Sequence, residues 1–240
     1  MGYLSNSHLT HLAPGVYLAD KPSGPSSHSI VNYFRRLSNL KRVGHAGTLD
    51  PLASGLLIIL IGREFTKQQT QYLKQDKEYL VTFILGQSTD TYDSTGQITA
   101  SSDWSEVEKI TPTQIETALT SFRGEIGQVV PIFSAVKIAG QKLYQKARRG
   151  ETVTLPSRQI TIHELELIDF QKNIKKETLS CSLRLRCSSG TYIRSLVHDL
   201  GQKLAVGATV TALRRTRIGD FHVKNAIVIQ TEDLRLRSKS

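Results

Sequence analysis

The sequence lacks the features of a secreted or membrane-bound protein. No stretch approaches the roughly 20 apolar residues that cross a bilayer. The first fifteen residues contain neither the basic region nor the apolar region of a signal peptide. The chain has only two cysteines, Cys181 and Cys187, which lie too far apart along one predicted strand to pair. Unpaired thiols suit a reducing compartment, so we expect a cytoplasmic protein.

Recognisable cofactor and metal motifs are also missing. Neither GxxxxGK[ST] nor a GxGxxG that opens a βαβ unit occurs in the chain. Asp90, Asp93 and Gly96 resemble part of a calcium loop, but the alternating acids and the closing glutamate are absent. Two cysteines do not make a zinc site. We therefore expect no cofactor and no metal.

Acidic residues are scarce relative to basic ones. The 240 residues include 31 Lys and Arg against 21 Asp and Glu, a net charge of +10. Such an excess favours a polyanionic partner, and nucleic acid fits better than a membrane because no basic amphipathic helix is evident. Residues 123–153 combine six basic residues and two acids with Phe133 and Tyr144, which indicates an RNA-binding segment or, alternatively, a solvated helix face.

Hydrophobic spacing predicts helices and strands in irregular order. Ser26 or Ser27 caps a helix, and Thr111 begins another with a capping box and proline at its first position. Further helices are expected over 141–149 and 192–204, with strands over 56–61, 78–85, 160–170 and 179–187. Because strands and helices do not alternate regularly as in βαβ units, the sequence favours an α+β fold with a mixed, mainly antiparallel sheet flanked by helices. We expect one domain over 1–225 and a frayed basic tail over 226–240.

The segment HAGTLDPLASG at residues 45–55 contains an isolated acid, Asp50. No other acid lies within a dozen residues of it, and an apolar run begins at Leu56. A carboxylate in such a bend is most often a turn former. Next to a buried strand, in a basic chain, it is also a candidate nucleophile or general base. We interpret the flanking glycines as room for a nucleotide to approach the backbone.

Four other residues offer similar alternatives. Arg194 and Tyr192 fall where a strand meets a helix, and they could hold a carboxylate and a planar ligand or simply start the helix. Tyr79 could stack on a base or pack in the core. His45 could contact a base or serve only in the turn.

Taken together, the motifs resemble those of the TruB family of pseudouridine synthases, which modify the T-loop uridine of tRNA. The blocks occur in the family's order: DKPSG at 20–24, VGHAGTLDPLASG at 43–55, DKEY at 76–79, LGQSTDTYD at 85–93, SAVK at 134–137, GTYIR at 190–194 and LRR at 213–215. A chance match of all seven is implausible.

The resemblance implies a role for each matching residue. Asp50 is the nucleophile, Tyr79 packs against the target base, and Arg194 pairs with Asp50. The remaining substrate-binding residues are His45 beside the flipped uridine, Tyr192 and Leu213 lining the pocket, and Lys21 supporting the site or contacting RNA. The expected partner is the T-arm of tRNA, bound by a monomer without a protein partner. A lysine that the family often carries is replaced here by Ser189.

The resemblance also implies the pseudouridine synthase fold. Many members of the family carry a C-terminal PUA domain, but few residues follow the LRR block, so we expect the catalytic domain alone. Two other functions are weighed against it. A non-catalytic RNA-binding protein would explain the charge but not the nucleophile. A phosphotransferase using Asp50 would call for further acids that bind Mg²⁺, and no convincing set is present.

Overall fold

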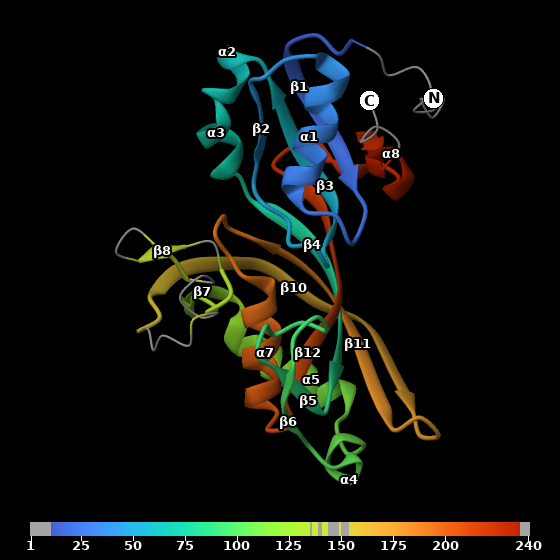
Figure 1. The fold of residues 1–240 in the computed structure, drawn as a ribbon. Helices are drawn as coiled ribbons and strands as arrows, with labels where there is room; N and C mark the ends of the chain where they lie inside the picture. Colours follow the sequence, from blue (N-terminus) through green and yellow to red (C-terminus); the bar gives the residue numbers. More distant parts are fainter. Residues whose placement is uncertain (1–10, 135, 139–140, 144–148, 150–153, 236–240) are drawn as a thin grey trace. The chain divides into compact units, whose positions relative to one another are not determined.

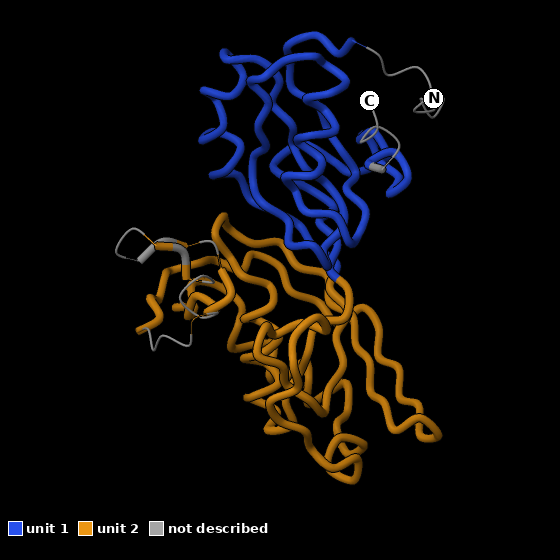
Figure 2. Tube along the Cα trace, in the orientation of Figure 1, with its two compact units in different colours: residues 1–80, 213–240 blue, residues 81–212 orange. Residues whose placement is uncertain are grey.

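A computed structural model describes residues 11–134, 136–138, 141–143, 149 and 154–235 (Figure 1). The chain divides into two compact units (Figure 2), of which unit 1 comprises 1–80 and 213–240 and unit 2 comprises 81–212. The chain leaves unit 1 within strand β4 (Lys77–Leu85) and returns to it within β12 (Ala208–Ile218). Unit 1 is therefore assembled from two segments that are far apart in the sequence.

Unit 1 is a mixed sheet with helices against it. Its other strands are β1 (Gly15–Lys21), β2 (Val43–Ala46), β3 (Ser54–Ile61), β13 (Phe221–His222) and β14 (Ile227–Val228). Its helices are α1 (Ser27–Ser38), α2 (Arg63–Thr66), α3 (Gln69–Leu73), the 3₁₀ turn η3 (Val223–Asn225) and α8 (Thr231–Arg235). β3 pairs antiparallel with β1 and β2 and parallel with β12, and β14 pairs parallel with β1.

β3 is buried on both faces, which explains its continuous apolar sequence. Leu57, Ile59 and Ile61 pack in a cluster with α1, while Leu56, Ile58 and Leu60 pack in a second cluster that includes residues of α3 and β12. A strand covered on both faces cannot alternate apolar and polar residues. The predicted strand at 56–61 is confirmed and begins two residues earlier, at Ser54.

α1 also follows the prediction. Ser26 is its N-cap, and the Ser26 side chain accepts a hydrogen bond from the backbone N–H of Ser29. The helix buries Ile30, Phe34 and Leu37 and ends at Asn39, which adopts a left-handed conformation. Its apolar stripe therefore faces the sheet, as the 3.6-residue spacing indicates.

The expected frayed tail at 226–240 is instead structured over part of its length. Ile227 and Val228 pair with Ala19 and Asp20 of β1, and Ile229 is buried in the cluster beneath α1. Residues 236–240 lie outside the described part of the chain. The basic character of the segment hid the three apolar residues at 227–229, which the edge of the sheet stabilises.

Unit 2 is organised around a long antiparallel hairpin. Its strands are β5 (Gln87–Thr89), β6 (Ile98–Ser101), β7 (Gly124–Val129), β8 (Lys137–Ile138), β9 (Gln141–Lys142), β10 (Ser157–Asn173) and β11 (Thr178–Cys187). Its helices are α4 (Trp104–Val107), α5 (Pro112–Leu119), the turn η2 (Thr120–Phe122) and α7 (Ile193–Lys203). The strand order is β4, β11, β10, β7.

β11 alternates as a half-buried strand should. Leu179, Leu183 and Leu185 are buried, as are both cysteines. Burial, with a smaller contribution from Asp169, raises the pKa of Cys181 to about 12. This thiol is therefore a core residue and not a nucleophile.

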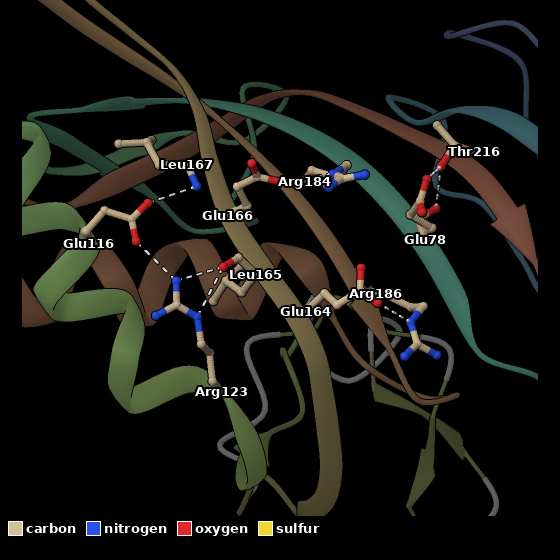
Figure 3. A network of polar contacts seen from close by, with 10 residues as sticks. All are labelled: Glu78, Glu116, Arg123, Glu164, Leu165, Glu166, Leu167, Arg184, Arg186 and Thr216. Atoms are coloured by element: carbon tan, nitrogen blue, oxygen red, sulfur yellow. Dashed lines mark hydrogen bonds and ion pairs between the residues drawn. The ribbon is translucent and has the colours of Figure 1, made fainter.

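The opposite face of the hairpin is charged (Figure 3). Glu164 lies across from Arg186 and Glu166 across from Arg184, and each pair is joined by an ion pair, at 3.0 and 2.9 Å. All four side chains are at least one-third exposed, so each pair contributes little to stability. Their effect is on strand register, because opposite charges face each other across the ladder.

α5 starts with the capping box predicted at Thr111 and Pro112. Glu116 on this helix accepts hydrogen bonds from the Leu167 backbone N–H and from Arg123 (Figure 3). Arg123 also donates to the carbonyl of Leu165, at 2.8 Å from Nη2 and 3.1 Å from Nε. These contacts fasten α5 to β10.

The α+β prediction with a mixed sheet is confirmed, as are the strands at 78–85, 160–170 and 179–187 and the helix at 192–204, with shifted ends. The predicted helix at 141–149 falls mostly on residues outside the described part of the chain. Among the described residues, no helix combines the length and apolar character that a membrane span needs.

Gly201 lies where α7 approaches the start of β12 in unit 2. A Cβ on Gly201 would overlap the backbone of Gly207 and Ala208. We expect Gly201→Ala to lower the free energy of unfolding by about 1–3 kcal/mol, despite alanine's higher helix propensity. Chemical denaturation measures the change. The control is Gly127→Ala on β7, whose Cβ would make only an ordinary 3.5 Å contact with Ser157; an equal loss in both variants would contradict the argument.

Candidate active site

Asp50 lies in the loop between β2 and β3, in unit 1. Asp50 is half-buried, whereas the nearby Leu49 and Ala53 are buried, at 4% and 0% exposed, respectively. The Ala53 N–H donates to the Asp50 carbonyl at 3.1 Å, which closes a tight turn through Pro51. The carboxylate is thus presented from a folded loop next to the most buried strand of the unit.

A buried ammonium group supports this loop. Lys21, at the end of β1, is 0% exposed. Its Nζ donates to the carbonyls of Pro22 at 2.9 Å and Pro25 at 2.7 Å, with a longer contact of 3.4 Å to the carbonyl of Pro51. Burial lowers the pKa of Lys21 to about 8, the Asp50 charge opposes this shift, and the Arg215 charge adds to it. The Lys21 and Asp50 charges therefore attract one another.

Further hydrogen bonds join the Asp50 loop to two serine side chains and to the backbone of Gly24. Ser27, at the start of α1, donates to the Leu49 carbonyl and accepts from the Leu49 N–H, both at 2.8 Å. Ser23 donates to the Leu52 carbonyl at 2.8 Å, and the Gly24 N–H donates to the Pro51 carbonyl at 2.8 Å. Residues on both sides of Asp50 are therefore fixed by hydrogen bonds to the DKPSG block and the start of α1.

Arg215 joins the two ends of the same loop. It is 1% exposed and donates from Nε to the Leu56 carbonyl at 2.8 Å and from Nη2 to the Gly47 carbonyl at 2.9 Å. A Cβ on Gly55, whose φ is +102°, would overlap the Arg215 backbone, and one on Gly47 would lie 3.4 Å from its Nη1. The two glycines therefore make room for Arg215, whereas the sequence suggested room for a nucleotide.

His45 lies on β2, at the entry to the loop. Burial, then the charges of Arg215 and His28, lowers the pKa of His45, so the ring is neutral at neutral pH. Its backbone carbonyl accepts a hydrogen bond from Gln69 at 2.6 Å. Its Nδ1 is buried and has no hydrogen-bond partner among the described residues. The ring is therefore neutral, and this nitrogen is shielded from solvent by the protein.

Tyr79 and Leu213 are buried in unit 1, at 7% and 8% exposed, on β4 and β12. Next to Tyr79, the carboxylate of Glu78 accepts a hydrogen bond from the Thr216 hydroxyl at 2.7 Å (Figure 3). This bond joins β4 to β12 close to both residues. Tyr79 and Leu213 therefore lie on two strands that this side-chain hydrogen bond joins.

Arg194 and Tyr192 belong to unit 2, at the start of α7. Arg194 is 6% exposed and donates to the carbonyls of Thr91 at 2.6 Å and Phe133 at 3.1 Å. It also forms an ion pair with Asp93 at 3.6 Å, in which both side chains are at most 7% exposed. Asp93 in turn accepts hydrogen bonds at one carboxylate oxygen from the Thr91 hydroxyl and from the N–H and hydroxyl of Thr95.

Tyr192 is the N-cap residue of α7 and is half-buried. The Arg158 guanidinium lies over its ring, 5.5 Å from the ring centre. Its backbone N–H and carbonyl both bond to the side chain of Gln128. The turn that carries Tyr192 and Arg194 is therefore supported from β7 and β10.

The structure gathers Lys21, His45 and Asp50 around one loop of unit 1 and holds Tyr192 and Arg194 together in unit 2. The predicted pair between Asp50 and Arg194 joins residues of different units and stays a prediction. In the part of the chain that the structure describes, no cluster of His, Cys, Asp and Glu could hold a metal ion.

Sequence reasoning missed two charged residues. Asp93 was considered as part of an incomplete calcium loop, and its place at the end of the LGQSTDTYD block is the signal that marks it. Arg215 follows Leu213 by two residues, so it shares a strand face with an apolar residue. A charged residue in phase with apolar ones is the signal that could have identified it.

Comparison with known proteins identifies the class. The family model described as TruB family pseudouridylate synthase (N terminal domain) matches residues 35–193, and that of the tRNA pseudouridylate synthase B C-terminal domain matches 194–238. A solved Cbf5–Nop10–Gar1 complex contains a chain with a TM-score of 0.66 and 29% identity, over 92% of this chain and 53% of that one. The fold is that of a pseudouridine synthase.

Curated relatives named tRNA pseudouridine synthase B indicate which family of pseudouridine synthases the chain belongs to. The Haemophilus influenzae protein is 46% identical over 94% of this chain and 70% of its own length. The Desulfotalea psychrophila protein is 42% identical over 89% and 85%, respectively. The chain belongs to the TruB family. It spans about half the length of the solved Cbf5 chain.

Lys21 provides a pH-dependent test of the loop. The pKa of Lys21 is about 8 in the fold and 10.5 as the reference value. Between pH 8 and pH 10.5 the unfolded chain binds more protons at Lys21 than the folded chain does, so the free energy of unfolding rises with pH. The cost of burying the Lys21 ammonium is present in full below pH 8 and disappears as pH rises toward 10.5. We expect the stability of the wild type relative to Lys21→Met to increase by up to about 3 kcal/mol across this window.

Urea denaturation of both proteins at a series of pH values measures this difference. Lys224→Met, at an exposed position of unit 1, serves as the control and should show a difference that does not change with pH. A difference between wild type and Lys21→Met that stays flat or falls with rising pH would exclude a depressed pKa.

The pair of Arg194 and Asp93 offers a second test. Asp93→Asn removes the carboxylate charge that lies 3.6 Å from the buried Arg194 guanidinium, so we expect a loss of roughly 3 kcal/mol in the free energy of unfolding. Arg217 and Asp220 provide a matched control, because they form an ion pair at the same 3.6 Å with the Asp220 side chain fully exposed. Asp220→Asn should change stability by less than about 0.5 kcal/mol in the same denaturation experiment. Similar losses in both variants would contradict the importance of burial.

Proposed function

We propose that this chain isomerises a specific uridine in the T-loop of tRNA to pseudouridine, with Asp50 as the nucleophile. One observation carries the proposal: the loop that presents the half-buried Asp50 is held by the buried cations Lys21 and Arg215. The loop belongs to a chain of the TruB family that keeps the family's aspartate block. A turn former alone would not need such support.

The reaction breaks the bond between N1 of uracil and C1′ of the ribose, turns the base, and forms a bond between C5 and C1′. The proton on C5 is released and N1 takes up a proton, so the product is an isomer of uridine and no redox step is needed. The target nucleotide must leave the stack before Asp50 can reach it, which costs a few kcal/mol. The Asp50 carboxylate then either forms a covalent adduct, with the base or at the ribose, whose bond to Asp50 breaks again before the product leaves, or stabilises cationic character at the sugar.

The other residues have positioning and binding roles in this proposal. Tyr79 packs against the target base, Tyr192 and Leu213 line its pocket, and neutral His45 contacts the flipped nucleotide. Lys21 has no exposed surface, which supports a role in holding the loop rather than in touching RNA. Arg194 pairs with Asp50 in the proposed complex.

The proposed partner is the T-arm of tRNA, bound in the cytoplasm by a monomer. A net charge of +10 supports attraction to the phosphate backbone. Much of the basic segment 123–153, including Tyr144, Lys146 and Arg148, lies outside the described residues, so its proposed clamping of RNA rests on its sequence.

A tritium-release assay tests the function. Incubation with tRNA labelled at C5 of uridine should release tritium, and Asp50→Asn should reduce the rate by at least about 1,000-fold while tRNA binding persists. Asp220→Asn, an exposed change of the same kind, should retain the wild-type rate.

Two outcomes would count against the proposal. Normal release by Asp50→Asn would remove the assigned nucleophile. Wild-type protein that binds tRNA but forms no pseudouridine would favour the alternative of a non-catalytic RNA-binding protein. Mapping pseudouridines in the treated tRNA identifies the position that is modified.

A further inference from the structure

We propose that Gln128 is a positioning residue that fixes the turn carrying Tyr192 and Arg194, and so sets the turnover rate without touching RNA. The inference rests on the proposed function, because it concerns residues that we assign to the site. Gln128 was not among the residues identified from the sequence. It lies on β7, 64 positions before Tyr192.

The contact between Gln128 and Tyr192 has two points. The Gln128 Oε1 accepts from the Tyr192 N–H at 2.8 Å, and its Nε2 donates to the Tyr192 carbonyl at 2.9 Å. Gln128 is 2% exposed, so water cannot readily replace either bond. The carboxamide thus bonds to the N–H and the carbonyl of one residue, as a residue on a neighbouring antiparallel strand would.

The turn needs this contact because its own residues do not cap the helix. Tyr192 is the N-cap of α7, yet its side chain makes no capping hydrogen bond. Its carbonyl accepts both from Gln128 and from the Leu196 N–H in the first turn of the helix. One carboxamide therefore fixes both the backbone before the helix and the helix start.

Arg194 depends on the direction of this helix start. It is two residues beyond Tyr192, and its guanidinium meets Thr91, Phe133 and Asp93 in a buried setting. Ser195 adds a second link to β7, with a 3.3 Å bond from its hydroxyl to the Val129 carbonyl. A small rotation of the turn would therefore move Tyr192 and Arg194 together.

Gln128→Glu turns the contact into a pH-dependent one. A protonated glutamic acid can still accept from the Tyr192 N–H and donate to its carbonyl, whereas a carboxylate can only accept and repels that carbonyl. Burial raises the pKa of such a carboxyl group toward neutrality. The variant should therefore be competent at low pH and impaired at high pH.

The experiment compares tritium release by the full-length wild type and Gln128→Glu from pH 6 to pH 8.5. We expect the ratio of variant to wild-type kcat to fall by at least about tenfold over this range, approaching a 100-fold deficit at pH 8.5. The KM for tRNA should change by less than about twofold, because phosphate contacts dominate affinity. Gln159→Glu, an exposed change on the adjoining strand β10, should give a ratio that does not depend on pH.

A flat kcat ratio for Gln128→Glu, or a change confined to KM, would overturn the proposal. Amide hydrogen exchange in the wild type keeps the proposal testable if the variant does not fold. Slow exchange of the Tyr192 amide is expected, and fast exchange would overturn the proposal. This measurement needs no catalysis, so a wild type that forms no pseudouridine would defeat the proposed function but not the contact.

Discussion

The bond between the Arg215 guanidinium and the Gly47 carbonyl is the constraint on which the Asp50 loop depends. It spans 168 residues and, with the second bond to Leu56, ties both ends of the loop to β12. A buried guanidinium is costly unless its donors find acceptors, and here the loop backbone supplies two of them. The loop and the cation therefore stabilise each other. Lys21, in the DKPSG block near the start of the chain, adds a contact to the Pro51 carbonyl of the same loop.

Much of the fold follows from local sequence signals. The capping box at Thr111, the Ser26 cap and the apolar run of β3 each specify an element through its own residues. Such signals say which elements form and which face is buried. They do not reveal that Gly55 faces the backbone of Arg215, because that contact depends on the parallel pairing of β3 with β12.

The candidate site was predictable to a similar extent. Asp50, Tyr79 and Arg194 lie in recognisable blocks, so the resemblance could assign them roles. Asp93 and Gln128 contact partners that are 101 and 64 positions away, respectively, and the sequence around each residue does not indicate which partner it has. The opposite happened for the 226–240 segment, where the basic residues led us to expect a frayed tail. Its apolar residues 227 and 228 instead pair with the edge strand of the sheet. Long-range packing decided each of these cases.

The division of unit 1 into two segments has a consequence for biosynthesis. Asp50, Lys21 and Ser27 emerge early from the ribosome, whereas Arg215 follows only after the whole of unit 2. Until then the carbonyls of Gly47 and Leu56 lack their guanidinium partner, and the loop has only its local hydrogen bonds. A nascent chain therefore holds Asp50 in an unfinished loop while unit 2 is being made. A strand near the end of the chain thus sets the geometry of one of the first loops.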